Sequence, residues 1–198
     1  MSLGKQAKVL SKTQVTAIRG YLLDRRNGLR NETMFLLSVK AGLRAKEIAS
    51  LTWSMVLNAD GTIASDIRLT DKASKGKSGR VIPMNTDVAG NLTAMLSVAS
   101  GTKAFTPSDR VITSERSDAV SSQMVVNSFR CWYRELGLEG CSSHSGRRTF
   151  ITNTARLIST CGGSLRDVQM MAGHASLQMT QTYIEGDSQS RSKVVNLL

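Results

Sequence analysis

The stretch that decides the fold is GHASLQMTQTY, residues 173–183. Gly173 follows two methionines of an apolar helical pattern, and a glycine at this point predicts the end of that helix. His174 comes next, and Tyr183 lies nine residues beyond it in a polar segment. A tyrosine hydroxyl has a pKa of about 10, so it needs nearby positive charge or a base before it can attack at neutral pH. The segment therefore offers a candidate nucleophile and a histidine from one short piece of chain.

Two upstream segments carry side chains that could complete such a site. Residues 144–147 read His-Ser-Gly-Arg, and this spacing places both ionisable side chains on one face at the start of a helix. Residues 41–51 read AGLRAKEIASL, which puts Arg44 just after a glycine turn. Considered alone, Arg44 is a helix residue paired with Glu47, and each histidine is a structural one.

The charge balance favours a polyanionic partner. The 198 residues include 26 Lys and Arg against 15 Asp and Glu, a net charge of +11, and such an excess is typical of proteins that bind nucleic acid. A membrane-surface or RNA-binding role ranks last; a membrane surface would require a basic amphipathic helix or a lipidation signal, and neither is evident. The chain has no apolar run of about 18 residues and no apolar leader, so we expect a cytoplasmic protein. Three cysteines without metal-ligand spacing predict reduced, mostly structural thiols and no metal site.

The apolar patterns predict an α+β fold that is mostly helical. A capping box at residues 11–14 begins a helix whose inner face carries Val15, Ile18 and Leu22. Asn31 is predicted as the N-cap of a second, buried helix. Further helices are predicted over residues 44–50 and 86–98, through Val125, Phe129, Trp132 and Leu136, after Ser145, and after a capping box at residues 164–167.

A small antiparallel sheet is predicted within residues 53–84. Residues 58–61 are a turn signal, residues 63–69 are compatible with a strand, and residues 81–83 resume one. Between them, residues 72–80 read KASKGKSGR, which is too basic and too rich in glycine for a core. We therefore expect a sheet that carries a basic loop.

Jointly, these motifs resemble the catalytic domain of the tyrosine recombinase (phage integrase) family. The family's first arginine box is similar to residues 41–51, its H-x-x-R box to residues 144–147, and its Gly-His box to Gly173-His174. Tyr183 follows at the interval usual for the family's nucleophile, and the resemblance runs from about residue 10 to residue 185. Each motif is common by chance, but the ordered set is not. The only two histidines of the chain both fall in these boxes, which favours a functional role for them.

The resemblance implies a DNA strand transferase of the recombinase type, which forms a 3′-phosphotyrosyl bond to Tyr183 and needs neither ATP nor metal. Arg44 and Arg147 would donate paired hydrogen bonds to the phosphate while staying charged. His174 would be a further donor to the phosphate. By resemblance, His144 would be the acid–base partner of the tyrosine hydroxyl.

The basic loop supplies the remaining member of the set that the resemblance implies. The family's hairpin lysine matches Lys75, eight residues before Pro83, and this distance distinguishes it from the neighbouring lysines. Lys75 would act as the general acid that protonates the leaving 5′-oxygen. The family's acidic residue matches Glu47, which would support the active-site arginine. The expected contacts with DNA come from Lys72, Lys77, Arg80, Arg148 and the helix that begins near Ser121.

Two positions depart from the family's pattern, and the choice among the three tyrosines also needs an argument. Arg148 stands where many members have histidine, and Ala172 stands where leucine is common, although neither change removes a catalytic group. Tyr183 is one of three tyrosines, but Tyr21 belongs to the first helix pattern and Tyr133 lies beside a tryptophan, so both are predicted to pack in the interior.

Residues 11–185 are predicted as the catalytic domain, residues 1–10 as a tail or cloning remnant, and residues 186–198 as a tail that could dock on a neighbouring protomer. The N-terminal helical domain with which most members clamp DNA is not expected here, so the chain is either a catalytic fragment or a short, single-domain member. The expected partners are double-stranded DNA, three further copies in a homotetramer, and accessory DNA-bending proteins. Two alternatives stay open, a type IB topoisomerase and a DNA-binding protein that retains the fold without activity.

Overall fold

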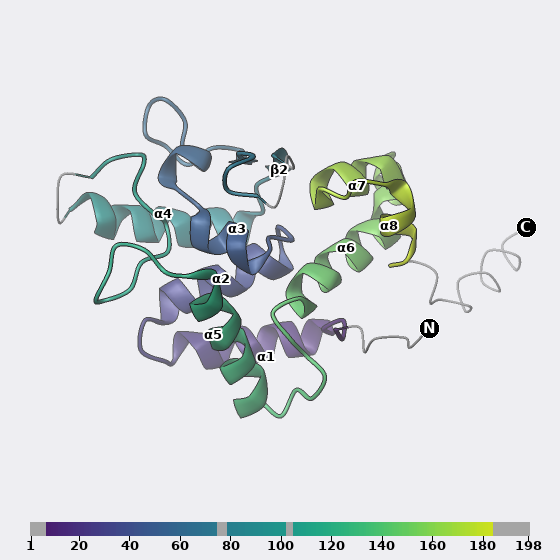
Figure 1. Cartoon of the computed structure of the whole chain (residues 1–198), viewed down its shortest axis with the longest axis horizontal. Coiled ribbons are helices and arrows are strands. Elements are labelled where there is room, and N and C mark those ends of the chain that lie inside the picture. The colour runs from purple at the N-terminus through teal and green to yellow at the C-terminus, as the bar shows by residue number, and fades with distance from the viewer. Residues whose placement is uncertain (1–6, 75–78, 102–104, 184–198) are drawn as a thin grey trace, which may run out of the picture.

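The computed structural model describes residues 7–74, 79–101 and 105–183, and it confirms a mostly helical fold with one small sheet (Figure 1). The helices are α1 Lys12–Leu23, α2 Gly28–Val39, α3 Ala45–Ser50, α4 Thr86–Ser100, α5 Ser122–Glu135, α6 Ser145–Leu157, α7 Leu165–Ala172 and α8 Leu177–Gln181. Two short 3-10 helices, Trp53–Met55 and Ile158–Cys161, and the strands β1 Asp66–Leu69 and β2 Arg80–Pro83 complete this part of the chain. Across the same residues, no helix is both long enough and apolar enough to cross a membrane.

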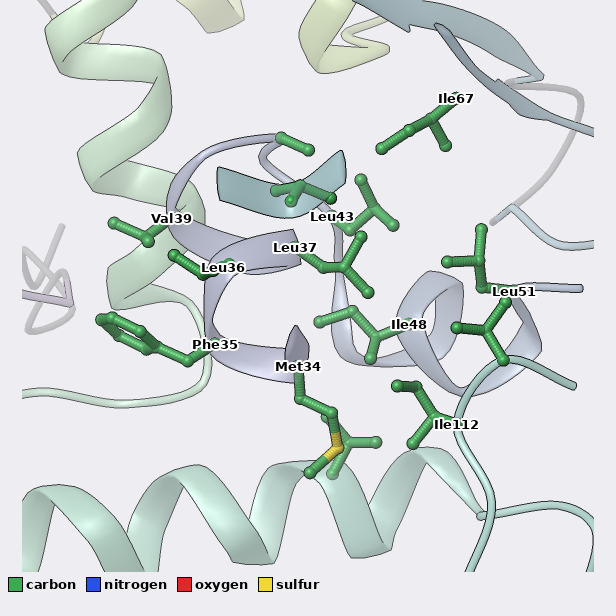
Figure 2. Packing of buried hydrophobic residues seen from close by; sticks show 14 of the residues in the cluster. Met34, Phe35, Leu36, Leu37, Val39, Leu43, Ile48, Leu51, Ile67 and Ile112 are labelled. Carbon is green, nitrogen blue, oxygen red and sulfur yellow. The ribbon is translucent and has the colours of Figure 1, made fainter. Parts of the chain in front are cut away.

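Helix α2 lies at the centre of the main hydrophobic core. Every residue from Met34 to Val39 is buried, and α2 packs against α1, α4 and α6. Figure 2 shows this run beside Leu43, Ile48 and Leu51, which follow it in the chain, and beside Ile67 of β1. The sequence prediction of a buried helix is confirmed. The segment that leaves the end of α2 toward α3, which contains the first arginine, is therefore held on a rigid support.

The start of α2 differs from the sequence prediction. The helix begins at Gly28, and its N-cap residue is Asn27, in a left-handed conformation at φ 60°. Asn31, predicted as the N-cap, is buried in the first turn, where its amide donates a hydrogen bond of 3.1 Å to the carbonyl of Arg26. The prediction was wrong because this asparagine side chain satisfies a backbone carbonyl of the preceding loop and not the free amides of a helix end.

The predicted small sheet is confirmed, but it is narrower than residues 53–84. Strands β1 and β2 pair antiparallel, with Asp66 opposite Pro83 and Leu69 opposite Arg80. Residues Trp53–Met55, at the start of the predicted region, form a 3-10 helix. Lys72 is exposed in the turn after β1, and Lys75 and Lys77 lie outside the described residues. The sheet brings Arg80, the first residue of β2, toward α7.

Helices α6, α7 and α8 form a smaller unit beside the main core, on the right in Figure 1. Ile151, Val168 and Ala172 are its buried centre, and Tyr183 packs against them. Helix α6 joins this unit to the main core because Gly146, in its first turn, lies against α2. A Cβ atom at Gly146 would come within 2.4 Å of the Ser38 hydroxyl oxygen, so only glycine allows this close approach.

Local capping signals were predictive at the helix starts. The capping boxes at Ser11 and Ser164 are both present, and each begins the helix that the sequence predicts. Helix α8 is not predicted by the sequence, because it has only five residues and its two apolar ones, Leu177 and Met179, do not have helical spacing. It begins after Ser176, whose hydroxyl accepts a 3.4 Å hydrogen bond from the Met179 amide.

Residues 7–10, expected to belong to a tail, include the buried Leu10, whose amide donates to the Thr149 hydroxyl at 2.8 Å.

Two of the tyrosines pack as the sequence predicts, whereas none of the cysteines is fully buried and Cys161 is exposed. Cys131, Cys141 and Cys161 are all free. Tyr133 is buried in the main core, and Tyr21 is partly buried against it. Neither of these tyrosines lies among the residues that surround Tyr183.

Candidate active site

The segment between α2 and α3 positions Arg44. Gly42, at φ 67°, turns the chain after α2, and a Cβ there would come within 2.4 Å of the Phe150 ring. Arg44 then occupies the N-cap position of α3, and its amide donates a 2.8 Å hydrogen bond to the Glu47 carboxylate. The Arg44 guanidinium donates a second hydrogen bond of 2.8 Å to the same carboxylate. One quarter of the Arg44 side chain stays exposed, so part of its charge faces outward.

Arg147 ties the first turn of α6 to both neighbouring segments. One of its terminal nitrogens donates a 2.7 Å hydrogen bond to the Gly42 carbonyl, and the other donates at 2.5 Å to the Ala172 carbonyl at the end of α7. The residue is only 5% exposed. Burial, followed by the positive charges of Arg44 and Arg80, lowers the pKa of Arg147 to about 9. It therefore remains charged at neutral pH.

His174 and Tyr183 lie together beyond α7. Gly173 ends α7 in a left-handed conformation at φ 62° and turns the chain so that His174 enters the interior. The imidazole Nδ1 of His174 is 3.0 Å from the Thr180 hydroxyl oxygen. The His174 and Tyr183 rings stack, with centroids 5.5 Å apart and planes inclined by 23°.

His174 is uncharged at neutral pH. Burial lowers its pKa to about 4, and the positive charges of Arg147, Arg44 and Arg80 contribute to the shift. When the buried Thr180 hydroxyl donates to Nδ1, the ring proton sits on Nε2. Nε2–H is then a neutral donor available to an oxygen in the site.

A cavity of about 440 Å³ brings these groups together. It is lined by Ala7, Arg44, Ser142, His144, Arg147, Arg148, His174, Met179, Thr182 and Tyr183. His144 is exposed at the N-cap position of α6, and Arg147 follows in the first turn, so the H-x-x-R spacing does direct both side chains to one place. The five predicted residues Arg44, His144, Arg147, His174 and Tyr183 therefore line one cavity, although they come from segments far apart in the sequence.

The predicted contacts with DNA need one revision. Arg80, placed by the sequence in the exposed basic loop, has only 5% of its side chain exposed. Its guanidinium donates to the Glu47 carboxylate at 2.8 and 3.0 Å and to the Met171 carbonyl at 2.7 Å. Every nitrogen of this guanidinium therefore has a partner inside the protein, and so little of the side chain is exposed that it does not face DNA at the surface. Lys72 is exposed, as a DNA contact must be.

Arg148 lies closer to the candidate nucleophile than its prediction as a DNA contact implies. Its guanidinium carbon is 5.8 Å from the centroid of the Tyr183 ring, and it lines the cavity. Its Nε is buried without a hydrogen-bond partner. This arginine places a further positive charge beside the tyrosine.

Sequence reasoning missed Thr180, the hydrogen-bond partner of His174. It lies in the polar segment before Tyr183, and no periodicity distinguishes it from its neighbours. The one sequence signal was its separation of six residues from His174, because α8 turns the chain so that Thr180 reaches the imidazole. Over the residues that the structure describes, no group of three or more His, Cys, Asp or Glu side chains is placed to hold a metal ion.

The buried Glu47 carboxylate carries the first testable consequence of this arrangement. Burial alone would raise its pKa, but the hydrogen bonds and charge of Arg80, then those of Arg44, outweigh burial and lower the pKa from 4.5 to about 2. A carboxylate whose pKa is depressed by folding stabilises the fold above its unfolded pKa, and the stabilisation is lost as the pH falls through the folded pKa. The shift corresponds to about 3 kcal/mol of stability at neutral pH.

We expect Glu47→Gln to lower the free energy of unfolding at pH 7 and to flatten its decline between pH 4.5 and 2. Urea unfolding at a series of pH values measures both effects. Glu139→Gln, at an exposed carboxylate, is the matched control and should keep the wild-type decline. An unchanged pH dependence in Glu47→Gln would show that this carboxylate does not govern acid stability.

Residues 8–190 match the family described as the phage integrase family, and the chain belongs to that family. Among its relatives, the tyrosine recombinase XerD of Pseudomonas aeruginosa is 29% identical over 185 residues, which are 91% of this chain and 58% of the relative. The chain thus spans about three fifths of that relative's length.

Solved structures share the fold. The crystal structure of XerA recombinase superposes with a TM-score of 0.72 at 20% identity, over 96% of this chain and 64% of that one. The Tn1549 transposon integrase, solved in complex with transposon right end DNA, gives a TM-score of 0.72 at 16% identity, over 98% of this chain and 65% of that one. These likenesses confirm the predicted architecture, a mostly helical domain with a small antiparallel sheet.

Proposed function

We propose that this protein binds double-stranded DNA and cleaves and rejoins its strands through a covalent bond to Tyr183, as a site-specific recombinase. The observation that carries the proposal is the cavity in which two arginines, a neutral histidine and a tyrosine converge. Membership of the phage integrase family supports it, as does the DNA complex of the similarly folded Tn1549 integrase.

The chemistry proposed for the cavity is a displacement at phosphorus. The Tyr183 oxygen attacks the scissile phosphate, an O–P bond to the protein forms, and the bond from phosphorus to the 5′-oxygen breaks. The tyrosine proton passes to a base, for which His144 is the candidate, and the leaving 5′-oxygen takes up a proton. The 3′-phosphotyrosyl ester conserves the bond, so that a 5′-hydroxyl can reverse the step and rejoin a strand.

The charged groups match what the transition state requires. A phosphodiester carries one negative charge, and negative charge gathers on its non-bridging oxygens as the fifth bond forms. Arg44 and Arg147 provide fixed positive charge with several N–H donors, and His174 provides a neutral donor. Lys75 is proposed as the general acid by resemblance alone, because it lies outside the described residues.

The net charge of +11 supports a large electrostatic share in DNA binding. Lys72 and Arg148 are the described candidates for phosphate contacts, with the start of α5 near Ser121 as a further one. Affinity should then fall steeply with salt. A homotetramer on two duplexes, with or without accessory DNA-bending proteins, is the assembly proposed for recombination.

Covalent capture from DNA of random sequence tests the proposal. The protein is incubated with a pool of nicked duplexes of random sequence, in which a released fragment prevents rejoining. We expect a protein–DNA adduct that resists denaturation, with a nucleotide attached to the peptide containing Tyr183. Sequencing of the captured DNA then defines the target. No adduct from the pool, or an adduct at another residue, would refute the proposal, and relaxation of supercoiled DNA without joined products would favour a topoisomerase.

Thr180 gives a more local prediction for the same reaction. We expect Thr180→Val to slow cleavage of the captured target by about 10- to 100-fold, because a hydroxyl that orients a functional histidine contributes about that much. Val has nearly the same shape but leaves the buried His174 Nδ1 without a partner, which costs about 1–3 kcal/mol, so thermal melting first establishes that the variant is folded. Single-turnover cleavage measures the effect. Thr180→Ser keeps the hydroxyl and should stay within about threefold of wild type, and equal rates in Thr180→Val and wild type would remove this role.

A further inference from the structure

Arg80 is a buried arginine that lies beside the candidate active site without lining its cavity. It begins β2, and its aliphatic stem packs on Gly173, where an added Cβ would come within 2.9 Å of the Arg80 Cδ atom. Its Nε donates to the Met171 carbonyl at 2.7 Å. Arg80 thus connects the sheet to the end of α7, the turn from which His174 departs.

Arg80 also shares the Glu47 carboxylate with Arg44. Arg80 donates to both oxygens of Glu47, at 2.8 and 3.0 Å, whereas the Arg44 guanidinium donates to one of them, at 2.8 Å. The Glu47 side chain is fully buried, so water cannot screen it. Without Arg80, Arg44 would be the one guanidinium partner of this carboxylate. The negative charge of Glu47 would then neutralise the positive charge of Arg44. A fully paired Arg44 is a weaker donor to a phosphate than a half-paired one.

The charges of the cluster lead to the same conclusion. Arg44, Arg80 and Arg147 are positive and Glu47 is negative, so the cluster carries a net charge of +2 beside the cavity. Removal of Arg80 alone would halve that charge. A site that must stabilise additional negative charge on phosphate oxygens depends directly on this surplus.

We propose that Arg80 is a positioning residue, which neutralises Glu47 so that Arg44 keeps its charge and its free N–H groups for the scissile phosphate. The inference rests on the proposed function, since it assumes that the cavity receives a phosphate. It assigns Arg80 a place behind the reacting groups, whereas the sequence placed it among the DNA contacts.

Sulfate binding tests the inference without DNA or cleavage. Sulfate is a dianion with tetrahedral oxygens, and its binding is followed by the side-chain N–H signals of Arg44 and Arg147 in nitrogen-15 NMR, at constant ionic strength. The variants are Arg80→Met, Glu47→Gln and the double variant that combines them, which restores the net charge of the cluster. Arg68→Met is the matched control, because it removes an exposed arginine from β1 of the same sheet.

We expect saturable shifts in wild type and at least about tenfold weaker sulfate binding in Arg80→Met. Glu47→Gln should bind sulfate more tightly than wild type, the double variant should return to within about threefold of wild type, and Arg68→Met should change little. Thermal melting identifies any variant that does not fold. If Arg80→Met is unfolded, the inference is tested by the sulfate affinities of the other proteins, which should be highest in Glu47→Gln and similar in wild type and the double variant.

Absence of saturable sulfate shifts in wild type would overturn the inference, as would a double variant that binds no better than a folded Arg80→Met. Equal binding in Glu47→Gln and wild type would do the same. Because these measurements involve no strand cleavage, they fail or succeed independently of the covalent capture experiment. A protein that captures DNA but shows no dependence of sulfate binding on Arg80 would keep the proposed function and lose this inference.

Discussion

Tyr183→Phe is expected to abolish the covalent DNA adduct, with a loss of about 10⁴-fold or more in the rate of cleavage. The substitution removes only the hydroxyl oxygen that would bond to phosphorus. The phenyl ring can still stack on His174 and pack against the α6–α7–α8 unit, so the fold and the DNA affinity should change little. Single-turnover cleavage of a nicked, end-labelled target, followed by denaturing electrophoresis, measures the loss.

Tyr21→Phe is the matched control for this experiment. It removes a hydroxyl that bonds to Glu135 and does not line the cavity, and it should leave the adduct at its wild-type level. DNA affinity measured by fluorescence anisotropy should agree within about twofold between wild type and both variants. A Tyr183→Phe protein that still forms the adduct would exclude this residue as the nucleophile.

Arg147→Met is expected to reduce the cleavage rate by about 10³-fold, because it removes charge and paired donors from the site. It should also lower the free energy of unfolding by about 2 kcal/mol or more, since the Gly42 and Ala172 carbonyls both lose a buried donor. Arg147→Lys restores the charge but not the two-pronged geometry, and an intermediate rate is expected. Cleavage is measured by the same single-turnover assay at a temperature where each variant is folded.

The control variant separates the effect of Arg147 within the site from the effect of losing one positive charge from the whole protein. Arg134→Met removes an exposed arginine from α5 and should cleave within about threefold of wild type at low salt. If a folded Arg147→Met cleaved within tenfold of wild type, Arg147 would have a structural role only.

Much of the fold was predictable because its signals are local. The serines that cap α1 and α7 are hydrogen-bonded to the residue three positions later: the Ser11 hydroxyl accepts from the Gln14 amide, and the Ser164 amide and hydroxyl donate to the Asp167 carboxylate. A few letters of sequence therefore suffice to predict these helix starts. The long apolar run of α2 likewise predicts burial whatever its neighbours are. Asn31 shows the limit of such signals, because an asparagine side chain can satisfy either a helix end or a loop carbonyl.

The sequence predicted which residues line the candidate site, but not the hydrogen bonds and ion pairs between them. Arg44, Arg147, His174 and Tyr183 belong to motifs with characteristic spacing, and the structure brings all four to one cavity. Their roles remain predictions. The burial of Arg80 could not be predicted, because its partner Glu47 lies 33 residues away in the chain. A basic residue beside a glycine-rich loop favours solvent exposure until the fold supplies a buried carboxylate.

The small unit of α6, α7 and α8 has a consequence for how the protein opens. Its buried centre consists of three residues, Ile151, Val168 and Ala172, so it gains little apolar burial of its own. Its attachment to the main core depends in part on Arg147, which donates to the Gly42 carbonyl after α2 and to the Ala172 carbonyl at the end of α7. Local unfolding should therefore begin at the tyrosine end, and amide hydrogens of α7 should exchange with deuterium before those of α2. The segment that contains the proposed nucleophile would then be ordered only while the groups proposed to bind phosphate are in place, so loss of Arg147 would be expected to release Tyr183 from the site as well as to remove a phosphate donor.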